Sequence, residues 1–293
     1  MTVAQAYERS AQMLLDGGFD RPRARLEARL LVDFVCQTRH AHLLKPDRVV
    51  DEKELETLMQ LCAALRDGEP LAYLTQRREF FGLDFRCDKR ALIPRPETET
   101  LVEAAVARLK NTPHALVADM GTGTGCIAIS VARAIPDARV WATDASPDAL
   151  ELARLNAQLN GVNHVRFVRG EIENWAAPLL NQSREERFDA ILSNPPYISQ
   201  LEIETLPSQI RDWEPRLALD GGIDGLDCYR DIAASCKRLL KLGGFLMLEL
   251  GANQFAGVRL IFINAGWNVE TPIRDLAGVE RVLVATRKVP ARR

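Results

Sequence analysis

The residues best suited to chemistry form a short run, Asn194-Pro195-Pro196-Tyr197, called the tetrapeptide below. As structure alone it is a turn, because consecutive prolines fix φ and cannot extend a strand. That interpretation leaves the flanking residues unexplained. Asn194 offers a side-chain carbonyl and Pro195 a backbone carbonyl, and two such acceptors match the two N–H donors of a planar NH₂ group. Tyr197 adds a flat face for stacking against a planar amide or base.

A second candidate site is the run Asp119-Met120-Gly121-Thr122-Gly123-Thr124-Gly125, called the glycine loop. Glycines let the backbone turn tightly and approach a ligand closely. The G-x-G-x-G spacing differs from the dinucleotide fingerprint G-x-G-x-x-G, whose third glycine comes one residue later. Taken alone, the loop is equally well a plain turn or the binding site of a nucleotide-like ligand.

Two carboxylates narrow the choice of ligand. Asp144 ends the next predicted strand, where an acidic side chain accepts both hydroxyls of a ribose. It is not needed as a helix cap, because Ser146 can cap the helix that starts at Pro147. Asp119, before the first glycine, would repel a pyrophosphate but suits a cationic group. A ribose and an ammonium group without a phosphate indicate S-adenosylmethionine.

The elements that must position these residues alternate between apolar strands and amphipathic helices from about residue 98 onward. Such alternation predicts a doubly wound, mainly parallel sheet covered by helices on both faces, an α/β fold. In such a sheet ligands bind beyond the carboxyl ends of the strands, where both candidate sites lie. Strands are predicted at residues 115–120, 139–143, 165–168, 188–193, 244–250, 267–271 and 281–286, and helices at 127–134, 147–160, 227–240 and 252–265.

The first ninety residues have a different pattern. Leucines recur at three- to four-residue spacing around residues 26–34 and 55–65, which predicts helices. Asp51 is placed to cap the second helix, and Gly68 followed by Pro70 ends it. The alternating, aromatic-rich residues 79–85 predict a short hairpin. We therefore expect a helical domain at residues 1–75, a hairpin linker at 76–97 and the α/β domain at 98–293.

Composition excludes several classes of protein. The 293 residues are 47% hydrophobic and 27% charged, which is ordinary for a globular protein. The net charge of −2 shows no basic surplus of the kind expected for a nucleic-acid-binding protein. The six cysteines form no C-x-x-C motif, and with neither a signal peptide nor a long apolar run they predict a cytoplasmic chain without metal site, disulfides or membrane span.

Together the glycine loop, Asp144 and the tetrapeptide resemble the class I S-adenosylmethionine-dependent methyltransferases that act on planar amino groups. These act on adenine N6 of nucleic acids or on the side-chain amide of glutamine. The segment Ile93-Pro94-Arg95-Pro96-Glu97-Thr98-Glu99 is similar to a signature of the bacterial release factor glutamine methyltransferases. Further similarity lies at residues 69–73, 220–227 and 275–278, so the resemblance runs from about residue 69 to the C-terminus.

The resemblance implies a seven-stranded methyltransferase sheet and a helical domain that recognises the substrate. The implied activity is methylation of N5 of the glutamine in the Gly-Gly-Gln motif of peptide chain release factors 1 and 2, by a monomer that binds no nucleic acid directly. Catalysis falls to Asn194, Pro195 and Tyr197, and substrate binding to the whole tetrapeptide with Pro196. The implied cofactor-binding residues are Asp119, Gly121, Thr122, Gly123, Thr124, Gly125, Asp144, Glu171, Ile172 and Asn194.

Two features of the resemblance qualify it. The family places Asp followed by an aromatic residue near the adenine, whereas this chain has Glu171-Ile172. Arg95 and Glu97 are expected to line the same cleft, or alternatively to form an ion pair between domains. The other functions considered are methylation of a ribosomal protein glutamine, methylation of adenine N6, an inactive homologue acting as a scaffold, and a nicotinamide dehydrogenase.

Overall fold

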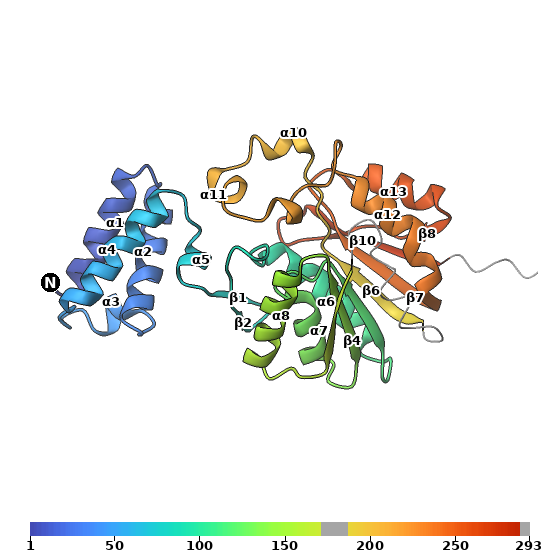
Figure 1. Ribbon diagram of the computed structural model, residues 1–293, viewed down its shortest axis with the longest axis horizontal. Helices are drawn as coiled ribbons and strands as arrows, with labels where there is room; N and C mark the ends of the chain where they lie inside the picture. The colour runs from blue at the N-terminus through green and yellow to red at the C-terminus, as the bar shows by residue number, and fades with distance from the viewer. Residues whose placement is uncertain (171–186, 288–293) are drawn as a thin grey trace, which may run out of the picture. The chain divides into compact units, whose positions relative to one another are not determined.

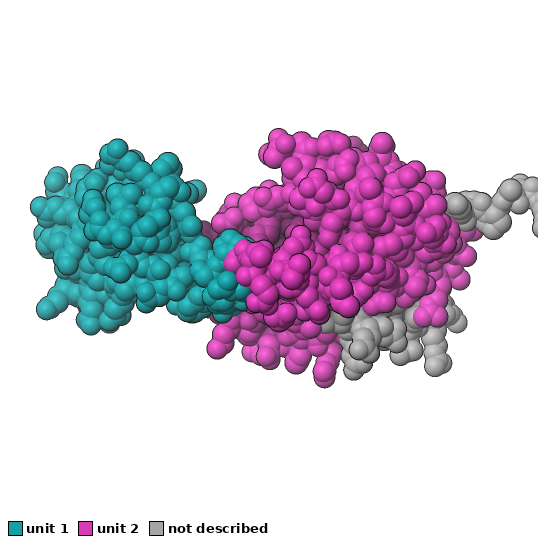
Figure 2. All heavy atoms as spheres, turned by 90° about the horizontal axis from the view of Figure 1, so that it is seen from above, with its two compact units in different colours: residues 1–76, 207–213 teal, residues 77–206, 214–293 magenta. Residues whose placement is uncertain are grey.

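The computed structural model describes residues 1–170 and 187–287. The chain forms two compact units, which Figure 2 colours separately. Unit 1 consists of Met1–Gln76 with Pro207–Trp213, and unit 2 of Arg77–Leu206 with Glu214–Arg293. Among the described residues, no helix has the length and apolar character needed to cross a membrane.

Unit 1 is helical. Its N-terminal part has α1 (Val3–Asp16), α2 (Arg21–Val35), α3 (Ala41–Leu44), α4 (Glu52–Arg66) and α5 (Leu71–Leu74), and its second segment carries α11 (Ser208–Arg211). The long helices start where the sequence offers caps: Thr2 and Asp51 each form a capping box, and the Asp20 carboxylate accepts from the Arg23 N–H. Leu14, Leu31, Leu58 and Leu65 are fully buried between these helices.

Unit 2 contains one mixed sheet in the order β5-β4-β3-β6-β7-β10-β8, with β9 paired to β10. The pairs among β3 to β7 are parallel, and β10 runs antiparallel to β7, β8 and β9. The strands are β3 (Leu116–Met120), β4 (Arg139–Asp144), β5 (Val165–Arg169), β6 (Phe188–Ser193), β7 (Leu240–Glu249), β8 (Trp267–Val269), β9 (Ile273–Arg274) and β10 (Glu280–Arg287).

Helices cover both faces of this sheet (Figure 1). The first face packs against α6 (Glu99–Leu109), α7 (Cys126–Ala134) and α8 (Pro147–Leu159), the second against α12 (Asp227–Ser235) and α13 (Phe255–Asn264). The central strand β3 makes this necessary, because it is buried along its entire length and needs cover on both sides. Shorter elements are the 3₁₀ helices η1 (Pro96–Thr98), η3 (Arg216–Ala218) and η4 (Cys236–Leu239), and α10 (Gln200–Ile203).

The predicted mainly parallel α/β sheet is confirmed. All seven predicted strands are present, and the two-residue β9 adds an eighth at the edge. The predicted hairpin is β1 (Arg78–Phe80) paired antiparallel with β2 (Leu83–Phe85). One helix was predicted too long: the α-helix expected over 227–240 ends at Ser235 and continues as η4, because β7 already begins at Leu240.

Candidate active site

A cavity of unit 2 opens where three parallel strands end. It encloses about 990 Å³ of empty space including its mouth. Its position follows from register: Met120 at the end of β3 pairs with Thr143 of β4 on one side and with Ser193 of β6 on the other. The loops after these strands therefore emerge side by side. The lining includes Arg90, Ala91, Ile93, Arg95, Thr98, Gly121, Thr122, Gly123, Thr124, Asp144, Gly170, Asn194, Pro196 and Leu217.

The glycine loop connects β3 to α7 with positive φ at all three glycines. At Gly125 φ is +84°, and a Cβ there would lie 2.8 Å from Ile129 Cδ1 and 3.2 Å from Ala153 Cβ. Glycine is thus required both by the backbone conformation and by the approach of α8 to the start of α7. This packing places the loop against the cavity.

Asp144 lines the cavity and accepts hydrogen bonds from backbone N–H groups. Its Oδ2 accepts from Gly123 N at 2.8 Å, and its Oδ1 accepts from Ser146 N at 2.9 Å. Ser146 caps α8 through Ala149 N at 3.1 Å, as predicted. Burial raises the pKa of Asp144, against these backbone hydrogen bonds. Each carboxylate oxygen keeps a second lone pair, so the carboxylate can still accept hydrogen bonds from two hydroxyl groups.

Asp119 lies behind the glycine loop and does not line the cavity. Its Oδ2 accepts from Thr122 Oγ1 at 2.6 Å and from Ala128 N at 3.2 Å. Its Oδ1 is buried without a hydrogen-bond partner. Burial raises the pKa of Asp119 to about 7. An unpaired acceptor at this place suits a cationic ligand group and disfavours a phosphate.

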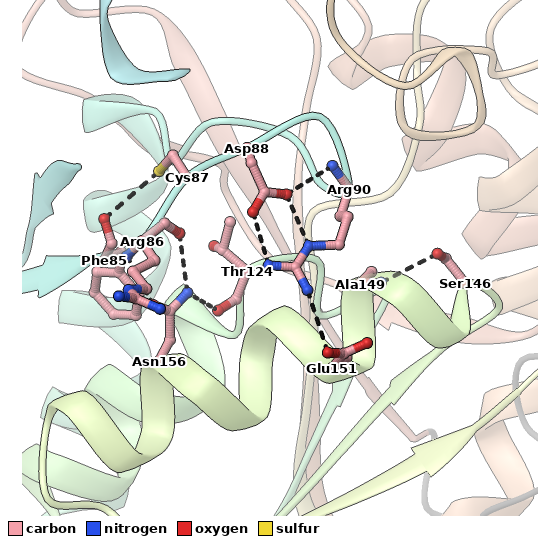
Figure 3. Close-up of polar contacts among 10 residues, drawn as sticks. All are labelled: Phe85, Arg86, Cys87, Asp88, Arg90, Thr124, Ser146, Ala149, Glu151 and Asn156. Carbon is pink, nitrogen blue, oxygen red and sulfur yellow. Dashed lines mark hydrogen bonds and ion pairs between the residues drawn. The ribbon is translucent and has the colours of Figure 1, made fainter. Parts of the chain in front are cut away.

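The segment 86–95 forms the opposite wall, and a buried amide attaches it to the glycine loop (Figure 3). Asn156 of α8 is fully buried. Its Oδ1 accepts from Arg86 N at 2.7 Å, while its Nδ2 donates to Arg86 O at 3.1 Å and to Thr124 O at 2.9 Å. The Asn156 side chain thus forms hydrogen bonds with backbone groups of both walls of the cavity.

We expect Asn156→Ala to lower the free energy of unfolding by about 1–3 kcal/mol, because it leaves these backbone groups without partners. Cofactor affinity should fall with it, since Thr124 lines the cavity. Asn160→Ala, one turn later, is the matched control: it loses a bond to Asp84 O, away from the cavity. Urea unfolding and calorimetric titration measure both quantities. Equal losses of affinity in the two variants would contradict this role of Asn156.

Two arginines line the cavity among the described residues, and both have carboxylate partners. Arg90 bonds Asp88 at 2.7 Å and approaches Glu151 of α8 at 3.7 Å (Figure 3). Arg95 pairs with Glu214, whose side chain is 1% exposed and whose Oε2 accepts from Ile93 N at 3.1 Å. Neither arginine is a free cation for a phosphate, which agrees with the phosphate-free ligand inferred from Asp119.

The expectation that Glu97 lines the cleft beside Arg95 is wrong. Glu97 is exposed and is not part of the cavity lining. The carboxylate beside Arg95 is Glu214, 119 residues further along the chain. Arg95 is partly buried beside Glu214 whereas Glu97 is exposed, so closeness in sequence could not identify the partner of Arg95.

The tetrapeptide follows β6 and is only partly exposed to the cavity. Asn194 and Pro196 line it, whereas Pro195 is buried and Tyr197 points its hydroxyl to Glu249 Oε1 at 3.4 Å. Asn194 Nδ2 donates to Thr98 Oγ1 at 3.2 Å. Burial raises the pKa of Tyr197, so this phenol is a neutral donor.

The cavity brings together most of the residues predicted as functional. Gly121 to Thr124, Asp144, Asn194 and Pro196 line it, and Asp119, Gly125, Pro195 and Tyr197 are close to these residues in the chain. Glu171 and Ile172 lie outside the described residues. Thr98 and Glu249 were not identified from the sequence as functional, although Thr98 lies inside the similar segment 93–99. Among the residues that the structure describes, no group of three or more His, Cys, Asp or Glu is placed to hold a metal ion.

Comparison with known proteins agrees with this geometry. The family model described as "Methyltransferase small domain" matches residues 98–221, and "PrmC N-terminal domain" matches residues 5–75. A release factor glutamine methyltransferase of Moorella thermoacetica is 40% identical over 98% of this chain and 99% of its own length. The chain belongs to the release factor glutamine methyltransferase family.

A second member of the release factor glutamine methyltransferases, from Nitratidesulfovibrio vulgaris, is 38% identical over 98% of this chain and 96% of its own length. A solved methyltransferase of Pyrococcus furiosus has a TM-score of 0.51 at 20% identity, over 71% of this chain and 91% of that one. The structural likeness supports the fold alone. The likeness in sequence to these release factor glutamine methyltransferases extends over both units.

Proposed function

We propose that this protein methylates N5 of the glutamine side chain in the Gly-Gly-Gln motif of peptide chain release factors 1 and 2, with S-adenosylmethionine as the methyl donor. The observation that carries the proposal is one cavity bordered by both the glycine loop and the tetrapeptide. The relatives that match nearly the whole chain are named release factor glutamine methyltransferases, which supports the proposal.

The cavity fits the proposed donor. Asp144 would accept hydrogen bonds from the ribose hydroxyls, and the unpaired Oδ1 of Asp119 favours a cationic group nearby. Arg90 and Arg95, the arginines among the described lining residues, already pair with carboxylates and do not invite a phosphate. Apolar side chains such as Ala91 and Ile127 supply surface for a purine. When bound, S-adenosylmethionine supplies an electrophilic methyl group on a sulfonium.

The chemical difficulty lies in the acceptor. A carboxamide nitrogen is a weak nucleophile because its lone pair is delocalised into the carbonyl. We propose that Asn194 Oδ1 and the Pro195 carbonyl oxygen accept hydrogen bonds from its two N–H groups. These two bonds would hold the nitrogen in line with the sulfonium methyl group and favour its pyramidalisation. These hydrogen bonds become stronger as the nitrogen becomes pyramidal, which lowers the barrier to methyl transfer. Holding the nitrogen in a fixed position lowers the barrier further. The nitrogen needs no base before attack, since its proton becomes acidic only as the new bond forms.

We propose the division at residues 1–75, 76–97 and 98–293, with the helical part recognising the release factor. The presence of a separate helical unit supports recognition of the whole release factor, because binding of a single glutamine side chain does not require a second unit. All residues that line the cavity belong to one chain and one unit, so a monomer suffices for the chemistry.

The test is mass spectrometry after incubation of the purified protein with S-adenosylmethionine and each release factor in turn. We expect one added methyl group on the glutamine of the Gly-Gly-Gln tryptic peptide, and none when that glutamine is replaced by alanine. Methylation of adenine in nucleic acid, or of a ribosomal protein instead, would refute the proposal.

A further inference from the structure

A buried carboxylate lies one step behind the cavity. Glu249, the last residue of β7, is 1% exposed and does not line the cavity. Its Oε2 accepts from Thr98 Oγ1 at 2.6 Å, and its Oε1 accepts from Tyr197 Oη at 3.4 Å. Glu249 therefore cannot reach a substrate, but it contacts two residues that border the tetrapeptide or belong to it.

The bonds of Thr98 have a direction. An ionised carboxylate only accepts, so the single hydroxyl hydrogen of Thr98 must go to Glu249. The Thr98 oxygen then offers only lone pairs to its other neighbour, and it accepts from Asn194 Nδ2 at 3.2 Å. The nitrogen of the Asn194 amide consequently faces Thr98, and its oxygen faces away.

This orientation matters because the two ends of an asparagine amide have the same shape but opposite hydrogen-bonding character. A rotation by half a turn would present an NH₂ group where Asn194 must present an acceptor. The NH₂ group of Asn194 would then face the NH₂ group of the substrate amide. Two hydrogen-bond donors cannot bond each other, so the substrate nitrogen that receives the methyl group would no longer be held in position.

We propose that Glu249, acting through the Thr98 hydroxyl, holds the Asn194 side-chain amide with its carbonyl oxygen directed to the substrate amide. Glu249 is thus a positioning residue. The inference rests on the proposed function for the nature of the substrate, while the orientation of Asn194 is a property of the protein alone.

The surroundings of Glu249 make this arrangement sensitive to pH. Burial raises the pKa of Glu249 to about 7, opposed by the Thr98 hydrogen bond and by Arg281 of β10. Glu97 adds to the increase. Among the described residues, the other titratable groups near Glu249 are Tyr197, Tyr229 of α12, whose hydroxyl donates to Glu249 O, and Cys126 of α7.

Protonation of Glu249 would reverse the direction of the hydrogen bonds that link Glu249, Thr98 and Asn194. A protonated Glu249 can donate to Thr98, which frees the Thr98 hydrogen to donate to Asn194 Oδ1 and lets the amide turn. The fixed orientation is therefore present above about pH 7 and is lost as the pH falls through that value.

The first experiment follows the Asn194 side-chain NH₂ resonance in protein labelled with ¹⁵N-asparagine, identified by its loss in Asn194→Asp. In the wild type we expect its chemical shift to titrate with a midpoint near pH 7. Glu249→Gln and Thr98→Val should abolish this titration, while Thr98→Ser, which keeps the hydroxyl, should retain it. An Asn194 side-chain resonance that is the same in Glu249→Gln and Thr98→Val as in the wild type would overturn the inference.

The second experiment measures turnover on the release factor at pH 6.5 and pH 8.5. At the higher pH we expect kcat of Glu249→Gln and Thr98→Val to fall about tenfold to a hundredfold with unchanged cofactor affinity, and Thr98→Ser to stay near the wild type. A purely structural role would lower thermal stability while leaving kcat and its pH profile intact. If the wild type does not methylate the release factor, the proposed function fails, and the NMR titration still decides the orientation.

Discussion

Asn194→Ala is expected to lower kcat for glutamine methylation by about 10²–10³-fold, comparable with the removal of one preorganised hydrogen-bonding group from other active sites. The variant removes the acceptor that we place against a substrate N–H. Its backbone stays fixed, because Pro195 and Pro196 restrict the chain and β6 remains paired with β3. The affinity for S-adenosylmethionine should change much less than kcat.

Single-turnover kinetics and calorimetric titration of the cofactor separate the two effects. Asn160→Ala serves as a control for the loss of an asparagine, because that residue lies at the end of α8 and does not line the cavity. Equal losses in kcat and in cofactor affinity would mean that Asn194 chiefly binds the cofactor. The assignment of Asn194 as the acceptor for the substrate would then be wrong.

The fold could be predicted from the sequence because the pattern of each strand and helix agrees with the order in which they follow one another along the chain. Buried strands alternate with capped helices, and parallel strands connected this way bring their carboxyl ends to one edge. The glycine loop, Asp144 and the tetrapeptide could therefore be predicted to meet, although the glycine loop ends at Gly125 and the tetrapeptide starts only at Asn194. In the helical unit, the helix at residues 26–34 was predicted, but Leu26 is 49% exposed and Ala24 and Ala28 are buried in its place.

The supporting contacts could not be predicted, since they join residues far apart with no shared pattern. Thr98 and Glu249 are 151 residues apart, and Arg95 and Glu214 are 119 apart. Each of these acids is a single charged residue among many, and only the folded structure shows that it is buried. A buried carboxylate next to a predicted site is visible only once packing is known.

The segment at residues 220–227 was matched by similarity alone, and the structure gives its physical reason. Ile198 donates to Leu219 O and Gly221 donates to Ile198 O, so the segment pairs with the chain that leaves the tetrapeptide. Gly225 is buried against this chain, and a Cβ at Gly225 would lie 2.5 Å from the Tyr197 carbonyl oxygen. The glycines allow the segment to support the tetrapeptide at backbone distance.

Gly225→Ala is therefore expected to lower the free energy of unfolding by about 2–5 kcal/mol, from the left-handed backbone at φ +75° and the clash with the Tyr197 carbonyl. The same carbonyl accepts from Gln254 Nε2 at 2.8 Å, so it cannot move without breaking that bond. Displacement of the tetrapeptide should lower kcat by about a hundredfold.

Gly243→Ala isolates the cost of the backbone conformation, because Gly243 has φ +86° but no atom within 4 Å of the added Cβ. We expect it to lose only about 1–2 kcal/mol and to keep full activity. Urea unfolding gives the stability of both variants, and kcat measured below the unfolding transition gives the activity of the folded fraction. If Gly225→Ala keeps wild-type kcat once corrected for that fraction, residues 220–227 stabilise the fold without positioning the tetrapeptide. A selective loss of kcat in Gly225→Ala would instead tie the glycines of this segment to the geometry of methyl transfer.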